Sequence, residues 1–322
     1  MKILVTGGAG FIGANVSRSL VEAGHEVVVL DDLSTGNRRN LEGVTVRLVE
    51  DSILEPDALK AASQHCESVV HLAAIPSVPR SIKDPIGIHE ANATGTLRVL
   101  ESARVQGQHV VVASSSSVYG ANTAMPKRED MWTRPLSPYA VSKLASEAYT
   151  LAYQSSFGLS TIPFRFFNVY GPLQAAGHAY AAVIPAFLDN ALRGNPLVIE
   201  GDGKQTRDFT YIGTVTQVLC DAAVNKIVSP EPVNLALGTR HSIIELADMV
   251  IDQVGAGEVQ HVAPRAGDIR DSQAASDRLR KLFPNVAATP LSDGLATTAT
   301  WMSELLGSSP VTTRAGKEAA RV

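Results

Sequence analysis

The chain has 322 residues, enough for one large domain or for a domain with a smaller partner. Hydrophobic residues make up 45% and charged residues 19% of the chain, the proportions of an ordinary soluble enzyme. The formal net charge of -4 gives no electrostatic reason to expect nucleic acid or an anionic membrane as a partner.

No run of about 18 apolar residues occurs, so no transmembrane helix is predicted. The chain enters its first apolar stretch at Lys2 without a basic leader or cleavage site, from which we expect a cytoplasmic protein. Cys66 and Cys220 lie far apart in the sequence. They could pair in principle, but we expect two buried free thiols.

The first 115 residues alternate short apolar runs with longer amphipathic stretches. Runs with the composition of buried strands occupy residues 2–6, 26–30, 44–49, 68–72 and 110–113. Helical spacing marks residues 11–23, 56–63 and 86–106. This alternation predicts βαβ units, and hence an α/β fold with a Rossmann-like, doubly wound parallel sheet.

Ser137 and Pro138 predict the start of a further helix, because serine is a good N-cap and proline suits the first helical position. This helix runs towards Phe157, and a strand follows near residues 160–165. Beyond Asn168 the pattern becomes irregular, which predicts a smaller mixed α/β lobe. Its expected helices occupy residues 182–192, 215–224, 243–254 and 291–306.

These patterns predict a domain organisation. We expect an NAD-binding domain over residues 1–167, with added elements near 213–237, and a substrate lobe over 168–306. Residues 307–322 are small, polar and charged, and we expect them to form a flexible tail.

A glycine-rich turn separates the first predicted strand from the first predicted helix. Gly7 allows a tight turn, Gly10 lets the backbone approach a pyrophosphate, and Gly13 permits close contact between helix and strand. The helix N-terminus adds N–H donors and positive potential. Any tight turn can use glycines, but the strand before and the helix after this one predict a dinucleotide site.

An aspartate follows the second predicted strand. Asp31 stands 18 residues beyond Gly13, where a carboxylate can accept both adenosine ribose hydroxyls and would repel a 2′-phosphate. It therefore favours NAD over NADP. Arg38 and Arg39 lie nearby and could bind a 2′-phosphate, so NADP stays open as the cofactor. They can also be solvated loop charges. Asp51 could reach the adenine amino group or cap a helix.

Tyr139 and Lys143 lie four residues apart on the helix that begins at Pro138, so their side chains share a face. A free phenol has a pKa of about 10 and is a poor base at neutral pH. An adjacent ammonium, together with a positive nicotinamide ring, favours the phenolate. This spacing alone often marks a solvated helix face, but the dinucleotide motif favours catalysis. Residues 114–117 follow the fifth strand, where a hydroxyl could contact both a sugar and Tyr139.

Several motifs together resemble the extended short-chain dehydrogenase/reductase superfamily. They are the glycine loop over 7–13, His-Leu-Ala-Ala at 71–74, residues 92–96 and 114–120, and the Tyr139–Lys143 pair. Residues 165–172 and 201–209 are similar to its UDP-glucose 4-epimerase branch. The resemblance runs from residue 2 to about residue 306, in order and at normal spacing.

The resemblance implies a role for each matching position. Tyr139 would be the catalytic base and acid, Lys143 would bind the nicotinamide ribose, and Ser115 would bridge substrate and tyrosine. The implied NAD-binding positions are Gly7, Gly10, Phe11, Ile12, Gly13, Asp31, Asp32, Asp51, Leu72, Ala73, Ala74, Asn92, Tyr139 and Lys143. The implied substrate-binding positions are Lys83, Ser115, Ser116, Ser117, Tyr139, Asn168, Arg207, Arg265, Asp268 and Ser272. Two guanidinium groups, of Arg207 and Arg265, suit a diphosphate.

The implied reaction inverts C4 of a UDP-hexose through a 4-keto sugar, with NAD as the cofactor. Dehydratases of the superfamily place Asp-Glu after the hydroxyl residue, where this chain has Ser116 and Ser117. Decarboxylases usually carry a glutamate in that loop, and none is present. A UDP-glucuronate 4-epimerase stays open, as does an NAD-binding protein that has lost catalysis.

The resemblance also bears on substrate size and assembly. Related epimerases use a bulky aromatic residue at the position of Ser272 to exclude N-acetyl groups. We therefore expect activity on UDP-N-acetylglucosamine and UDP-N-acetylgalactosamine as well as on UDP-glucose and UDP-galactose. Related proteins dimerise through helices matching residues 86–106 and 139–157, so a homodimer is expected.

Overall fold

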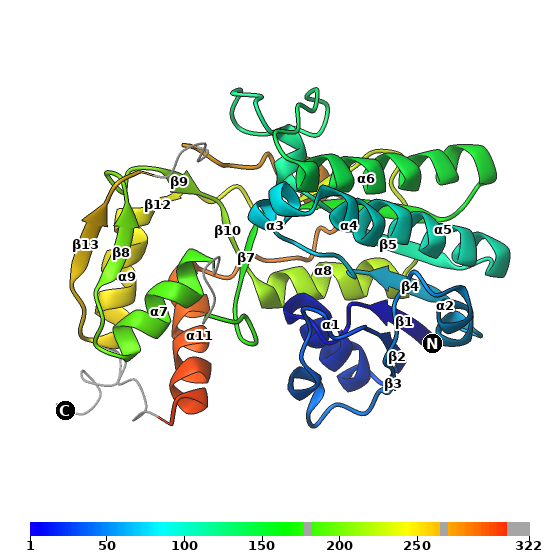
Figure 1. Cartoon of the computed structure of the whole chain (residues 1–322), viewed down its shortest axis with the longest axis horizontal. Helices are drawn as coiled ribbons and strands as arrows, with labels where there is room; N and C mark the ends of the chain where they lie inside the picture. The colour runs from blue at the N-terminus through cyan, green and yellow to red at the C-terminus, as the bar shows by residue number, and fades with distance from the viewer. Residues whose placement is uncertain (177–181, 265–269, 308–322) are drawn as a thin grey trace. The chain divides into compact units, whose positions relative to one another are not determined.

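The computed structural model describes residues 1–176, 182–264 and 270–307. The chain divides into two compact units (Figure 1). The first unit comprises Met1–Phe167, Val215–Leu235 and Ala275–Val286, and the second comprises Asn168–Thr214, Ala236–Ala274 and Ala287–Val322. Arg265, Asp268 and the predicted tail beyond Gly307 lie outside the described residues.

A seven-stranded parallel sheet forms the centre of the first unit, in the order β11-β6-β5-β4-β1-β2-β3. The strands are β1 (Lys2–Thr6), β2 (Glu26–Leu30), β3 (Arg47–Val49), β4 (Ser68–His71), β5 (His109–Ser115), β6 (Thr161–Phe166) and β11 (Val233–Leu235). Leu4, Val28 and Val110 are fully buried, as in a sheet covered on both faces. Strand order reverses between β1 and β4, where doubly wound sheets bind ligands. The predicted fold class is confirmed.

Helices flank this sheet, and α5 and α6 run side by side (Figure 1). They are α1 (Phe11–Glu22), α2 (Pro56–Ser63), α3 (Val78–Lys83), α4 (Pro85–His89), α5 (Gly95–Gln106), α6 (Pro138–Phe157), α8 (Ile212–Val224) and α10 (Asp277–Leu282). Short 3-10 turns form η1 (Arg38–Leu41) and η3 (Ser116–Tyr119). Cys66 and Cys220 are free, as predicted; Cys66 is buried and Cys220 half-buried.

Two predicted elements differ from the structure, and one helix was not predicted. The prediction of a single helix over residues 86–106 is wrong, because a π-turn, η2 (Glu90–Thr94), separates α4 from α5. The third strand begins only at Arg47. Helix α3 was not predicted, although the Ser77 hydroxyl accepts from the Arg80 backbone N–H as an N-cap.

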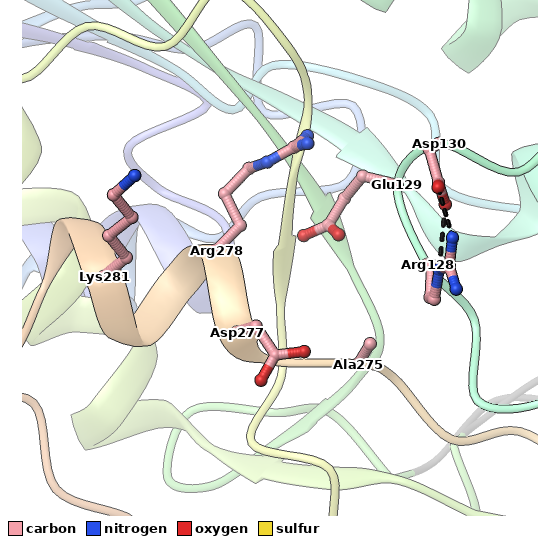
Figure 2. Close-up of a pocket in the computed structure, with 7 residues that line it drawn as sticks. All are labelled: Arg128, Glu129, Asp130, Ala275, Asp277, Arg278 and Lys281. Carbon is pink, nitrogen blue, oxygen red and sulfur yellow. Dashed lines mark hydrogen bonds and ion pairs between the residues drawn. The ribbon is translucent and has the colours of Figure 1, made fainter.

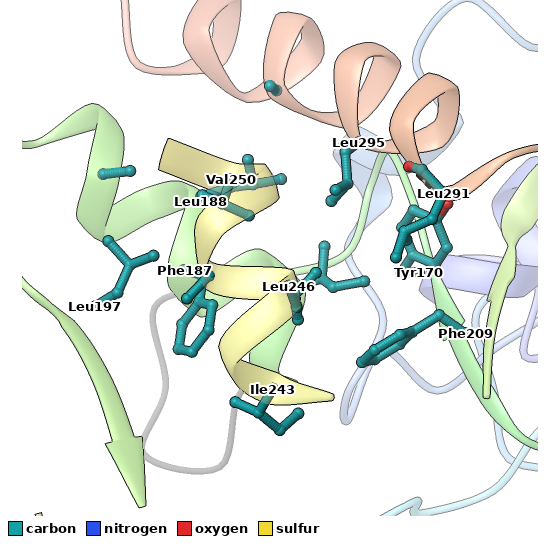
Figure 3. Close-up of a cluster of buried hydrophobic side chains, with 14 of the residues drawn as sticks. Tyr170, Phe187, Leu188, Leu197, Phe209, Ile243, Leu246, Val250, Leu291 and Leu295 are labelled. Atoms are coloured by element: carbon teal, nitrogen blue, oxygen red, sulfur yellow. Dashed lines mark hydrogen bonds between the residues drawn. The ribbon is translucent and has the colours of Figure 1, made fainter. Parts of the chain in front are cut away.

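The second unit packs α7 (Val183–Leu192), α9 (Ile243–Val254) and α11 (Leu291–Leu305) around one apolar cluster (Figure 3). Phe187, Leu246 and Leu295 are buried in that cluster. Parallel pairs join β8 (Leu197–Glu200) to β13 (Val259–Val262) and β7 (Asn168–Tyr170) to β10 (Phe209–Tyr211), and an antiparallel pair joins β9 (Thr206–Arg207) to β12 (His241–Ser242). Among the described residues, no helix has the length and apolar character of a membrane span.

Candidate functional site

The loops after β1 and β4 touch through their backbones. A Cβ added at Gly7 would lie 2.7 Å from the backbone nitrogen of Ala73, and φ at Gly7 is +72°. A Cβ added at Gly13 would lie 2.1 Å from the Gly7 carbonyl oxygen. The Thr6 hydroxyl accepts from the Ala73 N–H at 3.4 Å. Only glycine fits at these two positions of the turn.

Helix α1 presents its N-terminus at this turn. Gly10 is the N-cap, and it has no side chain with which to accept from the N–H groups of the first turn. Those groups have no acceptor within a helix and attract phosphate. Phe11 and Ile12, both half-buried, form the first turn. The glycine turn and the start of α1 thus form a backbone cradle, which a Cβ at the glycine positions would fill. This cradle fits the pyrophosphate of NAD.

Asp31 joins the glycine loop to the end of β2. Its carboxylate accepts from the Ala9 N–H and the Leu33 N–H, each at 2.9 Å, and the residue is only 7% exposed. Burial raises the pKa of this carboxyl, and the backbone donors partly offset that rise. Arg38 forms an ion pair with Glu50. Because that guanidinium already has a carboxylate partner, the local charge favours NAD over NADP.

The other acidic positions at this edge are solvent-exposed. Asp32 accepts from the Ser34 N–H at 2.9 Å. Asp51 accepts from the Ser52 N–H at 2.7 Å, and the N-cap of α2 is Glu55, so Asp51 does not cap that helix. Both carboxylates remain candidates for cofactor contacts.

The proposed reactive side chains come from β5 and α6. Helix α6 begins at Pro138 after Ser137, as predicted, and carries Tyr139 and Lys143 one turn apart. The side chain of Ser115, the last residue of β5, lowers the pKa of the Tyr139 phenol. Its Oγ also accepts from the Ser117 N–H at 3.2 Å and from the Ser117 Oγ at 2.9 Å. A hydroxyl has two lone pairs and one proton, so the Ser115 proton is left for the Tyr139 oxygen.

Burial dominates the electrostatics of this set. It raises the pKa of the Tyr139 phenol, which the Ser115 hydrogen bond lowers only in part. It lowers the pKa of the Lys143 ammonium to about 8. The protein's own groups therefore do not bring the phenol towards neutral pH. The expected lowering depends on the positive nicotinamide ring as well as on Lys143.

Asn92, in η2, links the loop after β4 to α6. This residue is 1% exposed. Its Oδ1 accepts from the Ile75 N–H at 2.8 Å, and its Nδ2 donates to the Ser142 Oγ at 3.0 Å. Ser142 in turn donates to the Tyr139 carbonyl oxygen at 2.8 Å. The Asn92 amide is thus engaged in holding the proposed cofactor loop against the proposed catalytic helix.

The inner face of α6 carries a stripe of hydroxyl side chains. Ser142, Ser146 and Thr150 follow one another at four-residue spacing, each 1% exposed or less. The Thr96 Oγ1 lies 3.0 Å from both the Ser146 Oγ and the His71 Nε2. Burial, with the charge of Lys143, lowers the pKa of His71 to about 3, so this imidazole is neutral. Sequence reasoning missed the stripe, although its spacing beside Lys143 was visible.

The remaining predicted residues are divided between the units. Leu72, Ala73 and Ala74 form the half-buried loop after β4, Ser116 begins η3, and Lys83 is the exposed last residue of α3.

In the second unit, the Asn168 Nδ2 donates to the Asp208 carbonyl oxygen at 3.1 Å. Arg207 donates to the Thr206 carbonyl oxygen at 2.9 Å, and the Ser272 N–H donates to the same oxygen at 3.1 Å. The second unit therefore brings Arg207 and Ser272 together.

A charged pocket of about 310 Å³ lies elsewhere in the first unit (Figure 2). It is lined by Arg128, Glu129, Asp130, Ala275, Asp277, Arg278 and Lys281, none of which is a predicted site residue. Arg128 pairs with Asp130, and Arg278 pairs with Glu231. Among the described residues, no group of three or more His, Cys, Asp or Glu side chains could hold a metal ion.

Residues 3–236 match the model of the NAD dependent epimerase/dehydratase family. The chain belongs to this family. It is 36% identical over 306 residues to a UDP-glucose 4-epimerase of Mycolicibacterium smegmatis, covering 92% of this chain and 97% of that protein. A solved UDP-N-acetylglucosamine 4-epimerase from Methanobrevibacter ruminantium M1, in complex with UDP-N-acetylmuramic acid, is 32% identical, with a TM-score of 0.90 and coverage of 94% of this chain and 98% of that chain.

A relative with a different activity is nearly as similar. UDP-glucuronic acid decarboxylase 1 of Xenopus tropicalis is 32% identical over 304 residues, covering 91% of this chain and 70% of that protein. Membership of the epimerase/dehydratase family makes this protein an NAD-dependent, nucleotide-sugar-modifying enzyme. Because relatives at similar identity carry different names, the particular reaction has to be argued from the residues.

Proposed function

We propose that the protein is an NAD-dependent UDP-sugar 4-epimerase. The observation that carries this proposal is the set of Tyr139 and Lys143 one turn apart on α6, with the Ser115 side chain acting on the Tyr139 phenol. The adjoining η3 turn offers hydroxyls at Ser116 and Ser117, which cannot act as the second acid–base pair that elimination of water requires. One group that takes and returns a proton is sufficient for inversion at C4.

The residues have distinct tasks in this proposal. Bound NAD supplies the acceptor and donor for the hydride of the sugar carbon. Tyr139, as phenolate, removes the proton of the 4-hydroxyl and returns it after the sugar has presented its other face. Ser115 donates to the phenolate oxygen, and the positive charge of Lys143 stabilises it. The backbone at Gly7, Gly10 and Gly13 would hold the pyrophosphate, and Asp31 the adenosine ribose.

The proposal is tested by NMR of the purified protein with separate UDP-sugars and no added cofactor. We expect UDP-galactose to give the signals of UDP-glucose, because NAD is regenerated in each cycle. UDP-glucuronate serves as the second arm. Its conversion to UDP-galacturonate alone would favour the glucuronate 4-epimerase, and loss of its carboxyl group would show a decarboxylase. No conversion by protein that retains NAD would leave only an NAD-binding role.

We further propose that Asn168, Arg207 and Ser272 bind the UDP-sugar, and that N-acetylated sugars are accepted. The support is the shared Thr206 carbonyl, which holds Arg207 next to Ser272. Ser272 is half-buried and small, so it leaves room where a ring would not.

Ser272→Tyr is expected to lower kcat/KM for UDP-N-acetylglucosamine by about tenfold or more, with a much smaller effect on UDP-glucose. A phenol ring would fill the space that the N-acetyl group needs. Initial rates on both substrates measure the ratio. Ser292→Tyr, at an exposed position of α11, is the matched control. Equal loss on both substrates would show that Ser272 does not discriminate between them.

We also propose a homodimer that forms through α5 and α6. Exposed apolar side chains on these helices include Val105, Val141 and Tyr149, which are 71%, 49% and 41% exposed. We expect Val141→Glu to convert the dimer into a monomer, because a charge buried in an apolar interface loses its hydration. Light scattering after size exclusion measures the mass. Val198→Glu, on β8 of the second unit, is the control. A monomeric wild-type protein at micromolar concentration would contradict the proposal.

A further inference from the structure

Two buried charged side chains that the proposed chemistry does not use form a bidentate ion pair. Glu147 of α6 and Arg165 of β6 are each 3% exposed. The Arg165 Nη2 donates to Glu147 Oε1 at 2.6 Å, and its Nε donates to Oε2 at 2.9 Å. Ser114 of β5 donates to the same Oε2 at 2.8 Å. One carboxylate therefore fastens α6 to two adjacent strands.

The guanidinium is held from its other sides as well. Its carbon lies 4.7 Å from the centre of the Tyr119 ring, and its Nη1 donates to the Glu129 carbonyl oxygen at 3.2 Å. The Tyr119 hydroxyl donates to Asn234 Oδ1 at 2.7 Å. Contacts with a ring, a backbone oxygen and a carboxylate leave Arg165 little freedom to turn. Its position is fixed.

Stability alone does not explain this pair. The free-energy cost of removing two charges from water offsets most of the attraction between them. Apolar residues of the same volume therefore often stabilise a fold as well as a buried ion pair does. The neighbours of the pair indicate a different role. Ser114 immediately precedes Ser115, and Glu147 follows Lys143 by one turn on the same face of α6. The pair thus connects both elements that carry the proposed reactive set.

We propose that Glu147 and Arg165 are positioning residues, in which Arg165 holds the Glu147 carboxylate on Ser114 and away from Lys143. The inference rests on the roles proposed for Tyr139 and Lys143. Without Arg165, Glu147 would be a buried anion one turn from the Lys143 ammonium. That ammonium would then neutralise Glu147 and be withdrawn from Tyr139. His71 of β4, which also faces Lys143, is neutral and would not intervene.

The test uses Arg165→Met in the NAD-loaded protein. The Tyr139 phenolate is titrated by absorbance near 295 nm, as the difference between each variant and the same variant carrying Tyr139→Phe. We expect the midpoint to rise by about one pH unit, since one unit corresponds to a tenfold change in equilibrium. Turnover of the UDP-sugar should fall about tenfold in kcat at neutral pH, with KM unchanged, and recover as the pH is raised.

The double variant Glu147→Gln/Arg165→Met removes the anion as well. We expect its titration midpoint to return to that of the wild type. Arg193→Met, which breaks the ion pair of the exposed Arg193 with Asp189, should leave the midpoint unchanged. If Arg165→Met does not fold, Arg165→Lys keeps a cation without the bidentate fork, and a smaller rise is expected.

A lowered melting temperature with an unmoved midpoint would overturn the positioning role, as would a midpoint that stays raised in the double variant. The titration does not depend on turnover. A wild type that converts no UDP-sugar, with midpoints that still move as expected, would overturn the epimerase proposal and leave the positioning role intact.

Discussion

Tyr139→Phe is expected to lower kcat for UDP-sugar epimerisation by about 10²–10⁴-fold, while the purified protein keeps its NAD. The substitution removes the hydroxyl that exchanges the proton of the sugar and leaves the half-buried ring in place. The Ser117 hydrogen bonds of Ser115 and the glycine loop are untouched. Initial rates by proton NMR, together with the NAD released on denaturation, separate catalysis from cofactor binding.

Tyr153→Phe provides the control on the same helix. The Tyr153 hydroxyl donates to Glu101 at 3.2 Å, and we expect its loss to leave the rate unchanged. Since the phenolate is the active form of Tyr139 and burial raises its pKa, the wild-type rate should fall as the pH is lowered. Near-normal turnover by Tyr139→Phe would show that another group exchanges the proton.

Gly13→Ala is expected to weaken NAD binding by at least about tenfold and to destabilise the first unit by about 1–3 kcal/mol. The new Cβ would lie 2.1 Å from the Gly7 carbonyl oxygen and 2.7 Å from the Gly8 Cα. Both are backbone atoms of the turn, so α1 has to move away from β1 to relieve the overlap. The NAD content of the purified protein and its melting temperature measure the two effects.

Gly107→Ala is the matched control. Gly107 follows α5 with φ of +67°, and a Cβ there would meet nothing within 4 Å. Alanine is strained in that conformation, at a cost of about 1 kcal/mol, but the cofactor loop is unaffected. We therefore expect a small loss of stability and full NAD content. A Gly13→Ala protein with stoichiometric NAD would mean that the turn is not the cofactor cradle.

The parallel sheet could be predicted because central strands buried on both faces appear as continuous apolar runs. The edge strand β3 has a single neighbour and is only partly buried, so its start at Arg47 left no clear apolar signal. The return of the chain to the first unit at Ala275–Val286 could not be predicted. It is held by contacts between distant segments, such as the hydrogen bond from the Asn234 side chain to the Ala275 carbonyl oxygen at 3.2 Å.

At the candidate site too, local patterns could be predicted, while features that depend on the folded chain could not. The glycine turn and the Tyr139–Lys143 spacing are local patterns, so the sequence was sufficient to select them. The Ser117 hydrogen bonds that direct the Ser115 proton depend on the η3 backbone. The Asn92 bridge depends on a π-turn inside an otherwise helical pattern. Neither follows from residue type and spacing, because each requires the path of the folded chain.

The buried hydroxyl side chains on α6 make this part of the interior less tolerant of substitution than an apolar core. Apolar cores accept exchanges among aliphatic side chains of similar volume, since their contacts have no direction. The contacts of Ser142 and Ser146 have direction, and each hydroxyl satisfies a partner that is itself buried. An alanine or valine at position 142 would leave one N–H of the buried Asn92 amide without its acceptor. Substitutions on the inner side of α6 are therefore expected to be tolerated less well than aliphatic exchanges in the apolar cluster of the second unit.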